Sequence, residues 1–113
     1  MTPMRRLDPQ TEKAVRAFLA KVPPELNLEK AIVFGSRARG DNRPDSDADL
    51  ALVFARGNEW PIVGLLAGLA FDVLMETGVL VQPVPISTVD WMHPERFPRP
   101  GFLRNVAKDG IAV

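Results

Sequence analysis

The spacing of hydrophobic and polar residues predicts that the chain opens with an amphipathic helix. Residues 10–21 carry apolar side chains at helical spacing, at positions 15, 18 and 19. Asp8 before them can serve as an N-cap, and Pro9 suits the first turn of a helix. We therefore expect a helix over 10–21, ended by the prolines that follow it.

A second helix is expected from Trp60-Pro61 to about Gly78, because a wide apolar stripe runs through this segment. Gly64 and Gly68 lie four residues apart inside it. They fit a close backbone contact or, as we favour, an ordinary weak stretch of helix. The stripe consists of Ile62, Leu65, Leu66, Leu69, Val73 and Leu74.

Three apolar runs, 31–34, 47–54 and 79–86, predict strands. The second run alternates before it becomes wholly apolar. Side chains two residues apart share one face of a strand, so Asp47 and Asp49 should project to the same side. The opposite side should pack on the domain through Ala48, Leu50 and Leu52.

The segment 90–100 is rich in proline and aromatic residues, and its pattern matches no regular element. Trp91 and Phe97 either fold back on the core or form an exposed apolar patch for a partner. His93, the only histidine, fits an ordinary surface position better than a catalytic one. A short helix over 102–108, stopped by glycine, and an apolar tail complete the chain.

Length and composition limit the classes of protein that need to be considered. The chain of 113 residues is expected to form one domain, 1–113, without room for a second substrate-binding domain. Its 14 basic and 14 acidic residues balance, so nucleic acid is disfavoured as a partner. Cysteine is absent, which excludes disulfides, thiolate zinc sites and cysteine nucleophiles.

No membrane or targeting segment is predicted. Residues 1–9 contain two arginines but no apolar stretch after them. The longest apolar region, 62–74, is too short and too interrupted by glycine to span a bilayer. We therefore expect a cytoplasmic protein that makes no membrane contact.

The turn after the first predicted strand, residues 35–40 with the sequence GSRARG, is suited to binding phosphate. Gly35 allows a close approach of the backbone to a ligand. If a helix starts here, its first amides and the Ser36 hydroxyl form an anion site. Arg37 and Arg39 add positive charge; each either contacts phosphate or pairs with a nearby surface acid, Asp41 or Asp45.

Asp47 and Asp49 are candidate ligands for Mg²⁺. Magnesium prefers hard oxygen ligands and is commonly held by one or two carboxylates together with substrate phosphates. Alone, an Asp-x-Asp sequence is more often a turn or a cap than a metal site. Next to a phosphate-binding turn, the same pair could hold two ions that activate a hydroxyl and stabilise the departure of pyrophosphate.

The spacing of Gly35-Ser36, ten residues, and Asp47-Ala48-Asp49 resembles that of the minimal nucleotidyltransferases (MNT) of the DNA polymerase β superfamily. This resemblance implies an α/β (α+β) fold in which a small mixed sheet is flanked by helices. It also implies ATP or another nucleoside triphosphate, Mg²⁺, and transfer of a nucleoside monophosphate to a hydroxyl. Many small members of the family resemble antitoxins that silence HEPN-domain toxins by adding AMP to a tyrosine.

One position departs from the family, which usually draws a third carboxylate from the strand after the central helix. That strand, 79–86, contains no acid, and Gln82 is the only polar side chain in its middle. A glutamine amide can offer an oxygen to a metal but carries no charge. Asp72 and Glu76 on the preceding helix are possible substitutes, although both also fit as solvated helix residues.

Two functions remain open from the sequence. The first is an enzyme that moves AMP from ATP to a hydroxyl, for which we expect a tyrosine of a HEPN toxin encoded nearby. The second is a catalytically weak or inactive module that binds nucleotide and neutralises or recruits its partner by contact. A small-molecule acceptor, as for aminoglycoside nucleotidyltransferases, is a weaker third alternative, and a homo-oligomer is possible under any of them.

Overall fold

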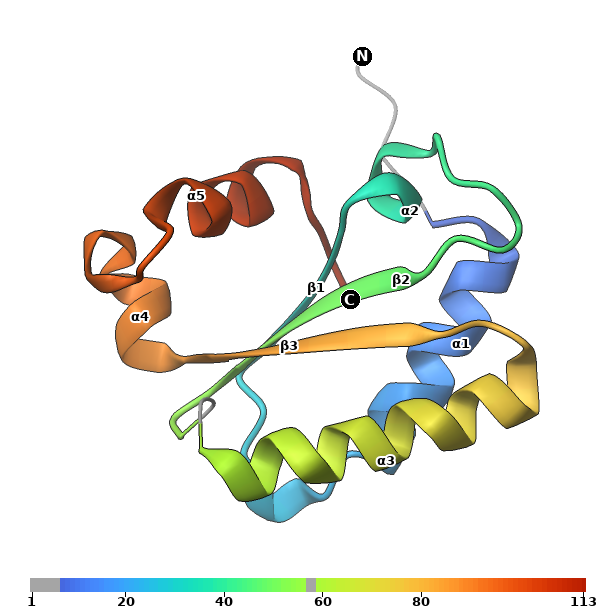
Figure 1. Cartoon of the computed structure of the whole chain (residues 1–113), viewed down its shortest axis with the longest axis horizontal. Coiled ribbons are helices and arrows are strands. Elements are labelled where there is room, and N and C mark those ends of the chain that lie inside the picture. The colour runs from blue at the N-terminus through green and yellow to red at the C-terminus, as the bar shows by residue number, and fades with distance from the viewer. Residues whose placement is uncertain (1–6, 57–58) are drawn as a thin grey trace.

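A four-stranded mixed sheet with the strand order β3-β2-β1-β4 forms the centre of the molecule (Figure 1). The computed structural model describes residues 7–56 and 59–113. Strand β1 runs antiparallel to both β2 and β4, whereas β2 and β3 are parallel. β3, which contains Pro83 and Pro85, forms one edge of the sheet and β4 the other. The strands are β1 (Lys30–Phe34), β2 (Ala48–Phe54), β3 (Val81–Ser87) and β4 (Ile111–Ala112).

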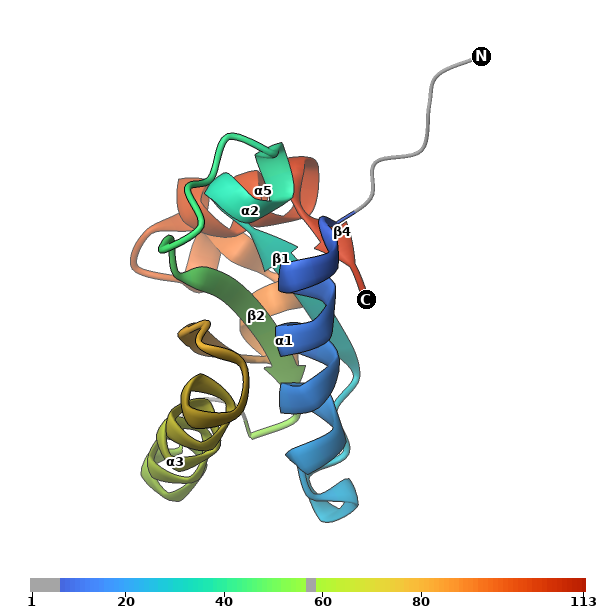
Figure 2. The same cartoon turned by 90° about the vertical axis from the view of Figure 1, so that its right-hand side faces the viewer.

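Helices cover both faces of this sheet. α1 (Pro9–Lys21) and α3 (Trp60–Thr77) pack on one face, and α4 (Thr88–Met92) and α5 (Pro100–Asp109) on the other (Figures 1 and 2). The predicted mixed sheet flanked by helices is therefore confirmed. The short elements are η1 (Pro24–Leu26), α2 (Ser36–Arg39) and η2 (Pro94–Arg96).

Helix α1 starts as its sequence predicts. The Asp8 carboxylate accepts a hydrogen bond from the Thr11 backbone N–H at 2.8 Å, which satisfies one of the free amides of the first turn. The buried side of the helix is formed by Thr11, Ala14, Val15 and Phe18. Three of these residues are apolar, so the one polar member of the buried side, Thr11, must find a partner inside the protein.

Helix α3 is the crossover that makes β2 and β3 parallel, and it ends at Gly78, whose φ of 77° favours glycine. Most of its predicted apolar stripe faces the core, but Leu65 is 38% exposed, so that part of the prediction is wrong. A Cβ atom added at Gly64 or Gly68 would meet open space. Neither glycine makes a close backbone contact to another element of the described structure.

The segment after β3 is more regular than its sequence suggests. We expected no regular element in 90–100, but α4 and η2 form there, and the Ser87 hydroxyl caps α4 by accepting from the Asp90 N–H at 3.1 Å. Trp91 and Phe97 fold back on the sheet, which confirms the first of the two alternatives. The apolar tail forms β4. The cluster on this face contains Ile32, Ala51, Val53, Ile86, Leu103 and Val106.

Two predictions concern the surface and the amino terminus. His93 is exposed, with its Nδ1 3.4 Å from a Glu95 carboxylate oxygen, in agreement with a surface position.

In the part of the chain that the structure describes, no helix is both long and apolar enough to cross a membrane. Most of the segment 1–9, for which no targeting pattern was predicted, lies outside the described residues, which begin at Leu7.

Candidate nucleotide and metal site

The structure brings the glycine turn and the carboxylates together at one end of the sheet. Gly35 follows β1 directly, and Phe34, the last residue of β1, pairs with Asp49 of β2. Gly35 adopts φ 74° and ψ −153°, a conformation that is essentially restricted to glycine. A Cβ atom at this position would lie 2.5 Å from Asp49 Oδ2. The turn therefore approaches the carboxylate closely only because residue 35 has no side chain.

Asp47 and Asp49 lie on the same side of β2, as the alternation predicts. Their neighbours Ala48, Leu50 and Leu52 are fully buried in the core that faces α1 and α3. Asp47 is exposed and Asp49 is half-buried on the opposite face, which α5 covers only in part. Both carboxylates can thus be reached by a ligand.

The electrostatics of this pair favour a cation. Burial raises the pKa of Asp49, the nearby charge of Asp47 raises it further, and the charge of Arg39 acts in the opposite direction. Within residues 7–56 and 59–113, no group of three or more His, Cys, Asp or Glu side chains could hold a metal ion. Two accessible carboxylates fit Mg²⁺, which completes its coordination with water and substrate oxygens.

Gln82 lies beside the carboxylates on the neighbouring strand. It is paired in register with Asp49, and its Nε2 donates a hydrogen bond to Asp47 Oδ2 at 3.0 Å. Gln82 therefore lies on the strand from which the resemblance implies a third carboxylate. Asp72 and Glu76 belong to α3 on the other face of the sheet, where Glu76 is 2.6 Å from Lys21 Nζ. Those two acids do not belong to the group of site residues.

Arg37 is buried beneath the loop that leads to β2. Its side chain is only 2% exposed, and its guanidinium donates to the backbone carbonyls of Pro44 and Ser46 and to the Thr11 hydroxyl. Of the two predictions for Arg37, pairing with Asp41 or Asp45 is wrong, because the guanidinium donates to neutral acceptors. A contact with phosphate stays a prediction, and the burial of Arg37 disfavours it. The helical turn of α2 directs this side chain inward, under the loop that leads to β2.

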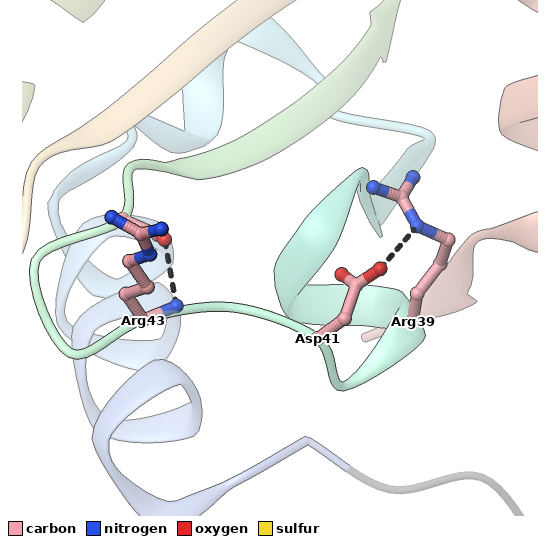
Figure 3. Close-up of polar contacts among 4 residues, drawn as sticks. Arg39, Asp41 and Arg43 are labelled. Atoms are coloured by element: carbon pink, nitrogen blue, oxygen red, sulfur yellow. Dashed lines mark hydrogen bonds and ion pairs between the residues drawn. The ribbon is translucent and has the colours of Figure 1, made fainter.

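Arg39 remains available at the site. It is exposed, and its Nε is 3.3 Å from Asp41 Oδ2 at the start of the loop, so the predicted pairing with a surface acid is present (Figure 3). The positive charge of Arg39 acts to lower the pKa of Asp49, against the effects of burial and of Asp47. Arg43 is an exposed loop residue, and its backbone N–H donates to the Ser46 hydroxyl at 2.9 Å (Figure 3).

A small pocket of about 90 Å³ adjoins the turn. It lies between the end of β1, helix α2 and helix α5, and the aromatic rings of Phe34 and Phe102 meet edge to face in its wall, with centroids 5.5 Å apart. A larger groove of about 380 Å³ lies between α1 and β4 and includes neither carboxylate. The larger of these two hollows therefore lies away from Asp47 and Asp49.

Sequence reasoning did not identify the residues that hold Arg37. The Thr11 hydroxyl accepts from Arg37 Nη1 at 2.8 Å and donates to Asp8 Oδ2 at 2.8 Å, and Gln10 Oε1 lies 3.3 Å from the same nitrogen. One signal was present, because Thr11 interrupts the apolar side of an amphipathic helix. A polar residue at such a position requires a buried partner.

Comparison with known proteins bears on the family and the fold of the chain. The family model described as Polymerase beta, Nucleotidyltransferase matches residues 15–113. No curated protein matches the sequence. A solved toxin-antitoxin structure with AMP-PNP superposes with a TM-score of 0.59 and 19% identity, covering 90% of this chain and 70% of that one.

A second solved structure, of a presumed nucleotidyltransferase from Sulfolobus solfataricus, is 21% identical, with a TM-score of 0.46 and coverage of 97% of this chain and 90% of that one. At these identities the first superposition shows a shared fold. The family match extends over nearly the whole chain and includes the glycine turn, both carboxylates and Gln82. This chain therefore belongs to the polymerase β nucleotidyltransferase family.

Proposed function

We propose that this protein transfers a nucleoside monophosphate, specifically AMP from ATP, to a hydroxyl group with the help of Mg²⁺. The observation that carries this proposal is the close approach of the Gly35 turn to Asp49, with Asp47 on the same face of the sheet. A triphosphate held by the turn would lie next to the two carboxylates. This is the arrangement that metal-assisted phosphoryl chemistry requires.

The proposed reaction is a displacement at the α-phosphorus. The acceptor oxygen forms a bond to this atom, the bond to the bridging oxygen of pyrophosphate breaks, and the acceptor proton passes to water. Asp47 and Asp49 would hold the metal, two ions in our proposal, while Gly35 and Ser36 would hold the triphosphate. Bound Mg²⁺ would lower the pKa of the attacking hydroxyl and stabilise the leaving pyrophosphate.

The remaining residues of the turn support binding of an anion. The Ser36 hydroxyl makes no hydrogen bond within the described residues, and Arg39 brings an exposed guanidinium to the same end of the sheet. A guanidinium can bind two phosphate oxygens at once. We therefore assign Arg39, and not Arg37, to the triphosphate.

We propose a partner protein as the acceptor, specifically a tyrosine of a HEPN-domain toxin encoded nearby. Asp47 is exposed and Asp49 is half-buried, so a large acceptor can reach the pair from solvent. The solved structure of the same fold is a toxin-antitoxin assembly with AMP-PNP, which supports a toxin as partner. Cytoplasmic location would follow from such a partnership.

A second function, a nucleotide-binding or partner-binding module without catalysis, is favoured by Gln82 alone. Its amide donates to Asp47 where a third carboxylate would help to activate the acceptor. A neutral amide takes up a proton poorly. The protein would then neutralise or recruit its partner by contact.

The test is to incubate the purified protein with the protein encoded next to it, Mg²⁺ and each nucleoside triphosphate in turn, and to measure the intact mass of both chains. We expect the neighbour to gain one nucleoside monophosphate. Asp47→Asn and Asp49→Asn should each reduce the transfer by about 100-fold or more. Asp45→Asn, an exposed turn residue in the same loop, is the matched control and should retain the activity.

Each outcome separates the alternatives. A triphosphate that binds without any mass gain would favour the binding module. If Asp47→Asn or Asp49→Asn unfolds the protein, the carboxylates are structural and the proposed metal site is wrong. Retained folding, checked by circular dichroism, together with lost transfer supports the enzyme.

A further inference from the structure

Arg37 is the largest side chain that is fully buried in the described structure. Its guanidinium makes no direct ion pair with a carboxylate among residues 7–56 and 59–113. Burying a charged group costs free energy unless hydrogen bonds compensate for the lost water. The compensation here comes from neutral acceptors, and their location indicates what the residue does.

Three of the hydrogen bonds end on the loop that leads into β2. Arg37 Nε and Nη2 both donate to the Ser46 carbonyl oxygen, at 2.9 and 2.7 Å, and Nη2 also donates to the Pro44 carbonyl at 3.1 Å. Nη1 points the other way and donates to the Thr11 hydroxyl at 2.8 Å. The guanidinium therefore joins the first turn of α1 to the loop.

The Ser46 carbonyl belongs to the same planar peptide unit as the Asp47 nitrogen. Two donors on one oxygen restrict the orientation of that plane, and with it the direction in which the Asp47 side chain leaves the backbone. At the far end of the same side chain, Gln82 Nε2 donates to Asp47 Oδ2. Asp47 is thus fixed through its backbone by Arg37 and through its carboxylate by Gln82.

Thr11 and Asp8 complete the support on the α1 side. The Thr11 hydroxyl accepts from Arg37 and donates to Asp8 Oδ2 at 2.8 Å, so its single proton is committed to the carboxylate. Partial burial acts to raise the pKa of Asp8, but hydrogen bonds from Thr11 and the charge of Arg37 outweigh it and lower that pKa. Arg37 has a carboxylate one hydroxyl away, which stabilises the buried cation.

We propose that Arg37 is a positioning residue: it orients Asp47 and thereby sets the affinity of the carboxylate pair for a divalent cation, without touching the nucleotide. The inference rests on the proposed function only in taking Asp47 and Asp49 as the metal-binding pair. A planar guanidinium can donate two hydrogen bonds to one carbonyl oxygen and a third to the Thr11 hydroxyl. A lysine ammonium carries the same charge on a single nitrogen and cannot reproduce this geometry.

The experiment measures binding of Mn²⁺ alone, by the electron paramagnetic resonance signal of the free ion, at neutral pH and without nucleotide. Arg37→Lys should weaken Mn²⁺ binding about 10-fold, and Thr11→Val, which removes only the hydroxyl support, by a smaller factor of about 3. Arg43→Lys, an exposed arginine of the same loop, is the matched control and should leave the affinity unchanged.

A second control separates positioning from a general loss of stability. Val15→Ala removes buried volume from α1 one turn after Thr11 and should lower the melting temperature without changing Mn²⁺ affinity. Excess Mn²⁺ should restore ATP binding to Arg37→Lys but not to Asp47→Asn. A simple structural role for Arg37 would not produce this rescue.

The outcomes distinguish this inference from the proposed function. Unchanged Mn²⁺ affinity in Arg37→Lys overturns the inference, and if that variant does not fold, unchanged affinity in Thr11→Val does so. A loss of ATP affinity in Arg37→Lys that excess Mn²⁺ cannot restore would also overturn it, because the arginine would then act on the nucleotide. If the unaltered protein binds Mn²⁺ but transfers nothing, only the proposed function fails.

Discussion

Gly35 connects the two halves of the candidate site at the scale of a single residue. Its dihedral angles allow the chain to leave β1 and enter α2 while passing directly over the Asp49 carboxylate. Any larger residue would require both a strained backbone and a displaced Asp49. The identity of residue 35 therefore controls where the carboxylate lies as well as how the turn is shaped.

Asp49 gives a prediction about stability and pH. Burial first, and the charge of Asp47 second, raise its pKa above 3.8, so the folded protein holds this proton more tightly than the unfolded chain does. The unfolding free energy should therefore fall as the pH rises through 3.8 and through the raised folded pKa. Asp49→Asn cannot ionise and should be more stable than the unaltered protein at pH 7 in the absence of metal.

Thermal unfolding in EDTA between pH 3 and pH 7 measures this effect. The advantage of Asp49→Asn over the unaltered protein should grow as the pH rises. Asp45→Asn in the exposed turn is the control for a general effect of removing one acid. A stability difference that is constant over the pH range would show that ionisation of Asp49 does not oppose folding.

Gln82 gives a second prediction at the residue scale. Gln82→Glu would replace the amide that donates to Asp47 with a third carboxylate in register with Asp49. Mn²⁺ affinity should rise about 10-fold, and any transfer activity should rise with it, because a charged oxygen ligand is added beside the pair. Gln82→Met has a similar length without the polar group and is the matched control.

The melting temperature of the metal-free protein tests the prediction for Gln82→Glu independently. Gln82→Glu brings three carboxylates together and should lower the melting temperature in EDTA, while Mg²⁺ should raise it more than in the unaltered protein. If neither metal affinity nor melting temperature changes, the side chain at position 82 does not face the metal site.

At the scale of elements, the outer helix α5 and the strand β4 depend on one tight turn. Gly110 joins them, and a Cβ atom there would overlap with Ile32 Cγ2 and lie 2.5 Å from the Val106 carbonyl oxygen. Gly110→Ala should therefore cost about 1–3 kcal/mol of unfolding free energy through overpacking. Denaturant unfolding measures this loss.

The control is Gly101→Ala within α5, where an added Cβ atom meets nothing within 4 Å. Alanine at this helical position should be neutral or slightly stabilising. Equal destabilisation by both substitutions would mean that the contacts of Gly110 are not what limits this turn.

The elements with strong periodicity could be predicted from the sequence, and those defined by tertiary contacts could not. α1, α3 and strands β1 to β3 follow their apolar patterns and caps closely. β4 has only two residues, too few for any period, and it exists because Val33 and Ile32 of β1 provide a partner. The prolines after β3 concealed α4, although Ser87 three residues before Asp90 is a helix-start signal.

Part of the candidate site could likewise be predicted from the sequence, and part of it could not. The distance in sequence between Gly35 and Asp47 predicted correctly that the turn and the carboxylates meet. The position of Arg37 could not be predicted, because its acceptors include Thr11, 26 residues away on another helix. Two arginines separated by one residue look equivalent in the sequence, and only packing shows that one is buried and the other exposed.

At the scale of the whole molecule, the two faces of the sheet differ in their apolar packing and in their exposed side chains. The face under α1 and α3 carries the larger apolar cluster, whereas the face under α4 and α5 carries the exposed Asp47 and the half-buried Asp49 at one end. β1 ends there, and β2 and β3 begin there, because β1 is antiparallel to β2 and β3 is parallel to it. Gly35, Asp47, Asp49 and Gln82 therefore come from three strands that meet at a single end.

The prolines of β3 limit how this protein can associate with other chains. β3 is an edge of the sheet, and a free edge normally invites a further strand to pair with it, as in amyloid. Proline has no N–H to offer, so Pro83 and Pro85 remove two donors from this edge within a seven-residue strand. Gln82 lies on the same strand, so the sheet edge next to the carboxylates is a poor template for a further strand.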